Sequence, residues 1–149
     1  EIIHAACAHY YRTYQRGVHA EIAALTDPLE RLRCVIESSV RTCVLDRGNR
    51  VFTTEIFTLL QRDAEAQKGW AQFYDTVREM YVGLVLAAES AGQIQVCEPR
   101  RAVDLMLAAI EGVKMRAAFE SQICDPDEQR FVVDSLLSIL TSQATTIPS

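Results

Sequence analysis

Glycine and proline are scarce in this sequence, with six and four copies among 149 residues. Alternating strand-like patterns, internal repeats and low-complexity segments are also lacking, and Pro28, Pro99 and Pro126 lie where a helix could begin. No stretch approaches the roughly 18 consecutive apolar residues of a membrane-spanning helix, and the N-terminal residues lack the pattern of a signal peptide. We therefore expect an all-α, soluble chain without membrane contact, located in the cytoplasm.

Motifs of catalysis and of metal or cofactor binding are lacking too. There is no G-x-S-x-G elbow and no glycine-rich phosphate loop. The only Glu-x-x-His spacing joins Glu1 to His4, whereas a ferritin-like di-iron site needs two such pairs and two further carboxylates. We expect no enzyme activity, and so no catalytic residues, no metal and no cofactor.

Cysteine pairs and basic clusters are the remaining absences. The five cysteines are odd in number, lie far apart and form no C-x-x-C pair, which argues against a disulfide framework or a zinc site. Twenty acidic residues against 15 basic ones give a net charge of −5, and Lys and Arg do not cluster beyond pairs such as Arg100-Arg101. DNA-binding modules carry a basic footprint, so these residues alone should not bind DNA well.

What the sequence does contain is apolar residues spaced three and four positions apart, the spacing of one helix face. Six such segments cover approximately residues 3–25, 28–43, 51–61, 64–90, 99–119 and 126–140. The dipeptides Asp27-Pro28 and Asp125-Pro126 each offer an N-cap followed by proline at the first helical position. Gly48, which can take the left-handed conformation that ends a helix, is expected to end the second helix, and Gly92 is expected to end the fourth.

The last two segments carry more apolar surface than one core contact needs, which predicts that they serve the core and a subunit interface together. We expect a homodimer closed by a four-helix bundle, with small residues on one helix allowing close approach and larger ones on the other filling it. The expected interface residues are Ala108, Ala109, Gly112, Phe131, Ser135, Leu136 and Ile139. The alternative is a monomer with a well-covered core.

The expected helices follow one another as a long first helix, a second helix, a short helix and then a long one. The second helix is opened by Leu25-Thr26-Asp27-Pro28-Leu29-Glu30-Arg31-Leu32-Arg33. This order and this opening resemble the regulatory half of the tetracycline-repressor (TetR) family. Glu1-Ile-Ile-His-Ala-Ala also looks like the start of the helix that follows the helix-turn-helix in that family. The resemblance implies a six-helix ligand-binding and dimerisation domain over residues 1–149, without the DNA-binding head. It further implies that residues 1–16 transmit ligand binding to that head, through which alone operator DNA would be bound.

Aromatic residues gather on one face of the fourth segment and could line a mostly apolar cavity, with Ser39 or Thr42 as orienting polar groups. The residues expected to contact a ligand are Ser39, Cys43, Phe57, Trp70, Phe73, Tyr74, Val77, Tyr81, Met106 and Ile110. Glu55, Glu111 and Arg116 could contact a polar part of a ligand, although solvation or pairing explains them more simply. The alternative for the aromatic stripe is that it is ordinary core.

The resemblance to the TetR family, together with the aromatic stripe, implies a ligand-responsive transcriptional regulator, most simply a repressor. An aromatic or lipophilic effector suits the stripe, and a fatty acyl or acyl-coenzyme A effector is a further candidate because the resembled family often senses such compounds. The rival reading is a helical adaptor domain that binds a protein partner and no small molecule. A cavity beside Tyr74 and Tyr81 would favour the sensor, and a filled core with an exposed groove would favour the adaptor.

Overall fold

The computed structural model describes residues 2–141, with the side chains of residues 2–7 and 11 left aside, so the Glu1–His4 pair lies outside the described part. The elements are α1 (Ile2–Ile22), α2 (Pro28–Ser39), the π-helix η1 (Val40–Leu45), α3 (Arg47–Leu60), α4 (Ala64–Ser90), α5 (Pro99–Arg116), the 3-10 helix η2 (Ser121–Cys124) and α6 (Pro126–Thr141). Residues 2–141 contain no strand, which confirms the all-α, six-helix expectation. Within this part, no helix combines the length and apolar character needed to cross a bilayer.

Aspartate caps fix where α2, α3 and α4 begin, and the cap of α4 is Asp63. The Asp27 carboxylate accepts the Glu30 N–H at 2.8 Å, ahead of Pro28 at the start of α2. The Asp46 carboxylate accepts the Asn49 N–H at 2.9 Å and starts α3. Each cap satisfies a backbone donor that has no partner within its helix.

One expected stop signal is wrong. Gly48 does not end the second helix; it lies in the first turn of α3, behind the Asp46 cap, and has no left-handed backbone. The expected third helix accordingly begins at Arg47, four residues before its apolar stripe. Gly92 behaves as expected, since its φ of 71° follows the end of α4 and it is the only positive-φ residue in the described chain.

The second expected helix is continued by a π-helix, which the sequence did not predict. The wider turns of η1 change the backbone hydrogen bonding, and side chains from α3 bind carbonyls at its end. The Arg50 guanidinium donates to the carbonyls of Val44 and Leu45, and the Asn49 amide donates to the carbonyl of Thr42 at 3.1 Å. The start of α3 therefore stabilises the end of the segment before it.

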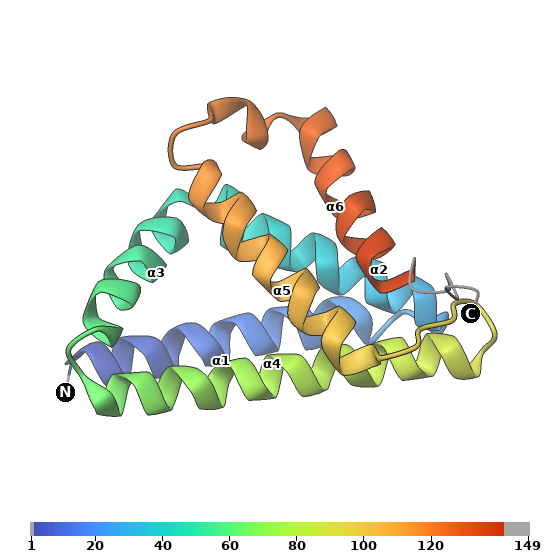
Figure 1. Cartoon of the computed structure of the whole chain (residues 1–149), viewed down its shortest axis with the longest axis horizontal. Helices are drawn as coiled ribbons and strands as arrows, with labels where there is room; N and C mark the ends of the chain where they lie inside the picture. Colours follow the sequence, from blue (N-terminus) through green and yellow to red (C-terminus); the bar gives the residue numbers. More distant parts are fainter. Residues whose placement is uncertain (1, 142–149) are drawn as a thin grey trace, which may run out of the picture.

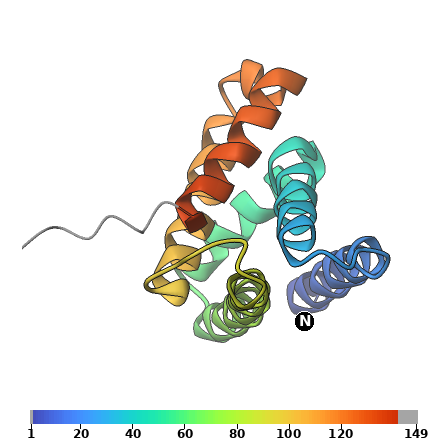
Figure 2. The ribbon, with the colours of Figure 1, turned by 90° about the vertical axis from the view of Figure 1, so that its right-hand side faces the viewer.

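Helix α2 packs against α1, α4 and α6, while α5 packs against α4, η1 and α6. Figure 1 shows α1 and α4 running along one edge, with α3 and α6 rising at opposite ends and α5 crossing in front. The turned view in Figure 2 places α5 beside α6 and away from α1. Polar contacts join neighbouring helices, including an ion pair of Arg78 with Asp104 between α4 and α5.

Burial is uneven among the helices. The core draws on α2, α4, α5 and α6, with Leu32, Tyr81, Met106 and Leu140 among its fully buried large side chains. In α3, a helix of 14 residues, only two residues are buried, Thr53 and Ile56. This helix therefore covers one side of the molecule with little apolar anchoring of its own.

Candidate functional site

A partly enclosed cavity lies where α1, the α2–η1 segment, α3, α4 and α5 approach one another. The cavity itself measures only about 40 Å³, and the whole empty space around it, including the part open to solvent, is about 520 Å³. It is lined by Tyr10, Tyr14, Ser39, Cys43, Thr53, Trp70, Phe73, Tyr74, Val77, Tyr81, Leu107, Ile110, Glu111 and Lys114. Because an apolar cavity of roughly 150 Å³ is known to accept benzene, this cavity must widen to take even one aromatic ring.

Aromatic rings form most of one wall. The centroids of Trp70 and Phe73 are 5.7 Å apart, those of Trp70 and Tyr74 6.1 Å, and those of Phe73 and Tyr74 5.9 Å. Tyr14 and Tyr10 of α1 meet the Phe73 ring edge-on at 6.4 and 6.5 Å. These spacings are those of favourable edge-to-face and tilted pairs, so the wall is a packed set of rings.

A chain of hydroxyl groups closes the inner end of the cavity. The hydroxyl of Ser39 lies 2.6 Å from that of Tyr14 and 2.7 Å from that of Tyr81. Tyr81 donates onward to the carbonyl of Val35 at 3.3 Å. Since the single proton of Tyr81 is used there, Ser39 must donate to Tyr81 and Tyr14 must donate to Ser39.

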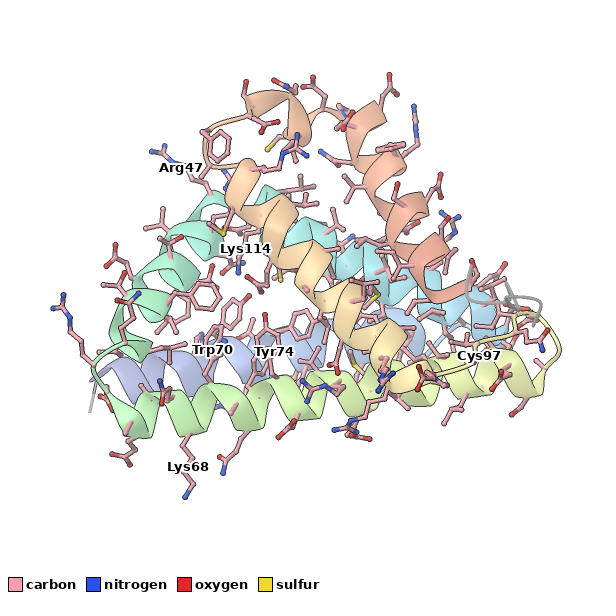
Figure 3. The ribbon with its side chains drawn as sticks, in the orientation of Figure 1. Arg47, Lys68, Trp70, Tyr74, Cys97 and Lys114 are labelled. Atoms are coloured by element: carbon pink, nitrogen blue, oxygen red, sulfur yellow. The ribbon has the colours of Figure 1, made fainter. Side chains whose placement is uncertain are left out.

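A second polar group lies on α5. The Tyr74 hydroxyl donates to the Glu111 carboxylate, which also pairs with the ammonium of Lys114 one turn along the helix. The Lys114 side chain is only 5% exposed and that of Glu111 27% exposed. The Lys114 Nζ also lies 5.0 Å from the centroid of the Phe57 ring, a cation–π contact. In Figure 3, Trp70, Tyr74 and Lys114 point into the space between α3, α4 and α5, whereas Lys68 points outward.

Burial keeps the other titratable groups of the cavity neutral. It raises the pKa of Tyr14 to about 12 and raises the pKa of Tyr10, Tyr74 and Tyr81 further above the usual value. Burial also raises the pKa of the Cys43 thiol, so this cysteine is a poor nucleophile. The charges of the cavity therefore reside in the Glu111–Lys114 pair.

Eight of the ten residues expected to contact a ligand line this cavity: Ser39, Cys43, Trp70, Phe73, Tyr74, Val77, Tyr81 and Ile110. Met106 does not, because it is fully buried in the core. Phe57 lies outside the lining and packs edge-on against Trp70 at 5.8 Å. Of the polar candidates, Glu111 reaches the cavity, Arg116 pairs with Glu120, and Glu55 is exposed on α3.

Sequence reasoning missed the contributions of Tyr10 and Tyr14 from α1 and of Lys114 from α5. A signal for Lys114 was present, because it continues the buried series Val103, Leu107 and Ile110 at helical spacing. A lysine in phase with an apolar stripe is unusual enough to mark a buried charge. Nothing comparable distinguishes Tyr10 and Tyr14 from other members of an apolar helix face.

The expected interface residues lie on the exposed side of α5 and on α6, which pack against each other. Ala108 and Gly112 are exposed, Ala109, Ser135 and Ile139 are half-buried, and Phe131 is 65% exposed. Leu136 is only 2% exposed, so the core of the single chain already covers it. Three exposed apolar residues extend the line of Ala108 and Gly112 along α5 and just beyond it: Leu105, Met115 and Phe119.

In the described part of the chain, no three His, Cys, Asp or Glu side chains come together in a way that could hold a metal ion. No protein-family model matches the sequence, and comparisons with curated proteins and with solved structures find no match either. The arrangement of the cavity and of the α5–α6 surface is therefore the basis for assigning a function.

Proposed function

We propose that this chain is the effector-binding and dimerisation part of a ligand-responsive transcriptional regulator of the tetracycline-repressor type, most simply a repressor. The observation that carries the proposal is the aromatic cavity, whose wall draws residues from α1 through α5. A pocket lined mostly by apolar and aromatic side chains with a few polar groups is the usual form of a small-molecule site. The six-helix order is compatible with such a regulator.

The position of α1 supports a relay from the cavity to a DNA-binding head preceding this segment. Tyr10 and Tyr14 of α1 belong to the cavity wall, and Tyr14 is hydrogen-bonded to Ser39 of α2. A ligand that pushes against these rings would move α1 relative to α2. In the proposed regulator, that movement changes the spacing of two DNA-binding heads in a dimer.

The exposed face of α5 supports the dimer. Leu105, Ala108, Gly112, Met115 and Phe119 follow one another at alternating spacings of three and four residues, the pattern of a helix–helix seam. The small residues Ala108 and Gly112 would let a partner helix approach closely, while the exposed ring of Phe131 on α6 would lie against the second pair of helices. Two copies joined through α5 and α6 would form the four-helix bundle.

Thermal denaturation tests the sensor. A ligand at a hundredfold excess over its dissociation constant stabilises the native state by about 2.7 kcal/mol, which is roughly 5–10 °C for a domain of this size. The panel comprises aromatic, lipophilic, fatty acyl and acyl-coenzyme A compounds. A shift that is lost in Tyr74→Ala but kept in Lys68→Ala, a change on the outward face of the same helix, is the expected result.

Sedimentation tests the dimer. The wild-type chain should sediment at twice its mass of 16.7 kDa, and Met115→Glu should give a folded monomer because this side chain is exposed in the single chain. Leu86→Glu, at an exposed apolar site on α4, is the matched control and should stay dimeric. A monomeric wild type would remove the dimer from the proposal.

A second candidate function is an adaptor domain that binds a protein partner. The observation in its favour is the exposure of Phe119, Met115 and Phe131, which are 74%, 68% and 65% exposed, combined with the small cavity. Under this reading the α5–α6 surface binds another protein, and no compound of the panel shifts the melting temperature. A ligand-induced shift together with a dimer would exclude it.

A further inference from the structure

Lys114 is the least expected residue of the cavity, because a lysine is seldom fully buried without full pairing. An ammonium group has three N–H donors. Among the described residues it contacts the Glu111 carboxylate and the face of the Phe57 ring, and no further acceptor. At least one N–H donor is therefore left over on a side chain that is only 5% exposed.

The spare donor is carried by one of the side chains that line the cavity. The Lys114 charge is close enough to the Cys43 thiol, another residue of the lining, to counteract the rise in pKa that burial causes there. Figure 3 shows the Lys114 side chain extending from α5 toward the side on which Tyr74 and Trp70 lie. A ligand that lies against these rings would therefore bring its polar group close to Lys114.

The cavity's hydroxyl donors, in contrast, are engaged with the protein itself. Tyr14, Ser39 and Tyr81 form the directional chain that ends at a backbone carbonyl, and Tyr74 donates to Glu111. Thr53 donates to a carbonyl of its own helix at 2.9 Å. A ligand is therefore better matched if it supplies an acceptor for Lys114 than if it must compete for these hydroxyl donors.

Charge balance decides between a neutral and an ionised ligand. Glu111 and Lys114 cancel one another, and burial holds the tyrosines and Cys43 neutral. A carboxylate bound to Lys114 would lie against Glu111 and be repelled, and an ammonium group bound to Glu111 would be repelled by Lys114. A neutral oxygen acceptor completes the hydrogen bonding of Lys114 without adding charge to a poorly hydrated space.

Building on the effector-sensing function, we propose that the cavity binds a neutral aromatic compound with a carbonyl-type oxygen, stacked against Trp70 and Tyr74 and hydrogen-bonded to Lys114. The ring lies against the aromatic wall, and the oxygen accepts the spare N–H. Because the cavity must widen to hold one ring, a compact ligand fits it better than a long acyl chain. Lys114 is the residue that determines specificity for the oxygen.

The test uses four single-ring probes of similar size, measured by calorimetric titration of the wild-type chain: acetophenone, ethylbenzene, benzoate and benzylamine. We expect acetophenone to bind at least tenfold more tightly than ethylbenzene, in line with a hydrogen bond to a charged donor. Benzoate and benzylamine should bind more weakly than acetophenone. Tightest binding by either ion would overturn the proposal.

Variants then attribute the preference to Lys114. The double variant Glu111→Gln with Lys114→Met removes both charges and leaves no unpaired ion, and circular dichroism checks that it stays folded. It should bind ethylbenzene as the wild type does and lose the tenfold preference for acetophenone. Arg116→Met, two residues further along α5 and in an ion pair with Glu120 outside the cavity lining, should keep the preference.

The outcomes separate this proposal from the function on which it rests. If ethylbenzene binds as tightly as acetophenone, or if the double variant keeps the preference, the role of Lys114 is refuted while the apolar sensor stands. If none of the four probes binds the wild type, the ligand class proposed here is refuted. The effector-sensing function itself fails only if the wider thermal panel is also without effect.

Discussion

The ion pair in the cavity should respond very differently to the loss of each partner. Removing one member of a buried pair typically costs about 3–5 kcal/mol, because the other charge is left without compensation. Glu111→Gln leaves the 5%-exposed Lys114 in that state, and we expect a loss of about 3 kcal/mol in the free energy of unfolding. The Gln carbonyl can still accept the Tyr74 hydroxyl, so this change isolates the charge.

Lys114→Met leaves the Glu111 carboxylate without its partner, and this charge is less costly to leave unpaired than that of Lys114. One oxygen of Glu111 keeps the hydrogen bond from Tyr74, and the oxygen that faces Lys114 is buried. Because the side chain as a whole is 27% exposed, a rotation of the carboxylate can bring that second oxygen to water once Lys114 is replaced. We expect a loss of about 1 kcal/mol, similar to an ordinary hydrogen bond. The double variant should lose no more free energy of unfolding than Lys114→Met alone. That result corresponds to a coupling free energy between the two sites of roughly 3 kcal/mol.

Urea denaturation followed by the fluorescence of Trp70, the chain's single tryptophan, measures all four proteins of this cycle. Arg116→Met with Glu120→Gln is the matched control at the C-terminal end of α5, and this surface pair should show a coupling below about 1 kcal/mol. Equal losses for the two single variants, or additive losses in the double variant, would refute the assignment of Lys114 as a buried charge held by Glu111.

Three further changes test other parts of the structure. The free energy of unfolding should fall as the pH rises from 10 towards 12, because the unfolded Tyr14 phenol ionises near 10 while the folded one, with its pKa raised to about 12, keeps its proton. In urea titrations, Tyr14→Phe should lose free energy of unfolding with pH less steeply than the wild type, by up to about 1.4 kcal/mol per pH unit. An unchanged slope would contradict the burial of this phenol. Iodoacetamide at neutral pH should modify the exposed Cys97 at least about a hundredfold faster than Cys43. This factor corresponds to a free energy of local opening of roughly 3 kcal/mol at Cys43. Comparable rates of the two cysteines in peptide mapping would show that the cavity is open. Asp63→Ala removes the acceptor of two backbone N–H groups at the start of α4 and should destabilise the protein by about 1–2 kcal/mol in thermal denaturation, whereas Asp75→Ala in the exposed middle of that helix should have little effect.

The helices were predictable because their signals are local. Apolar spacing gave all six, and Asp27-Pro28 marked the start of α2 within the same few residues that form its cap. The π-helix was not predictable in this way. Its carbonyls are bound by Arg50 and Asn49, so the conformation of η1 depends on where α3 packs, and sequence spacing within η1 carries no record of that contact.

The same distinction holds for the cavity. Trp70, Phe73, Tyr74, Val77 and Tyr81 share one face of α4, so helical spacing alone brought them together. Tyr14 reaches Ser39 across 25 positions of sequence, and its place in the cavity follows from how α1 packs on α2. Gly48 failed as a stop signal because the Asp46 carboxylate captured the N–H of Asn49 and began a helix where glycine would otherwise have ended one.

The sparse burial of α3 has a consequence for how selective the cavity can be. Segments with few buried side chains undergo local unfolding at a lower free energy than the rest of a protein, and hydrogen exchange detects them as the least protected helices. With Thr53 and Ile56 as its only buried residues, α3 is such a segment, whereas the walls formed by α2, α4 and α5 belong to the core. A displacement of α3 would then accommodate compounds of different thickness at a similar cost in free energy. Discrimination between them would fall to the rigid groups of the opposite side, and chemically related molecules of several sizes would elicit the same response.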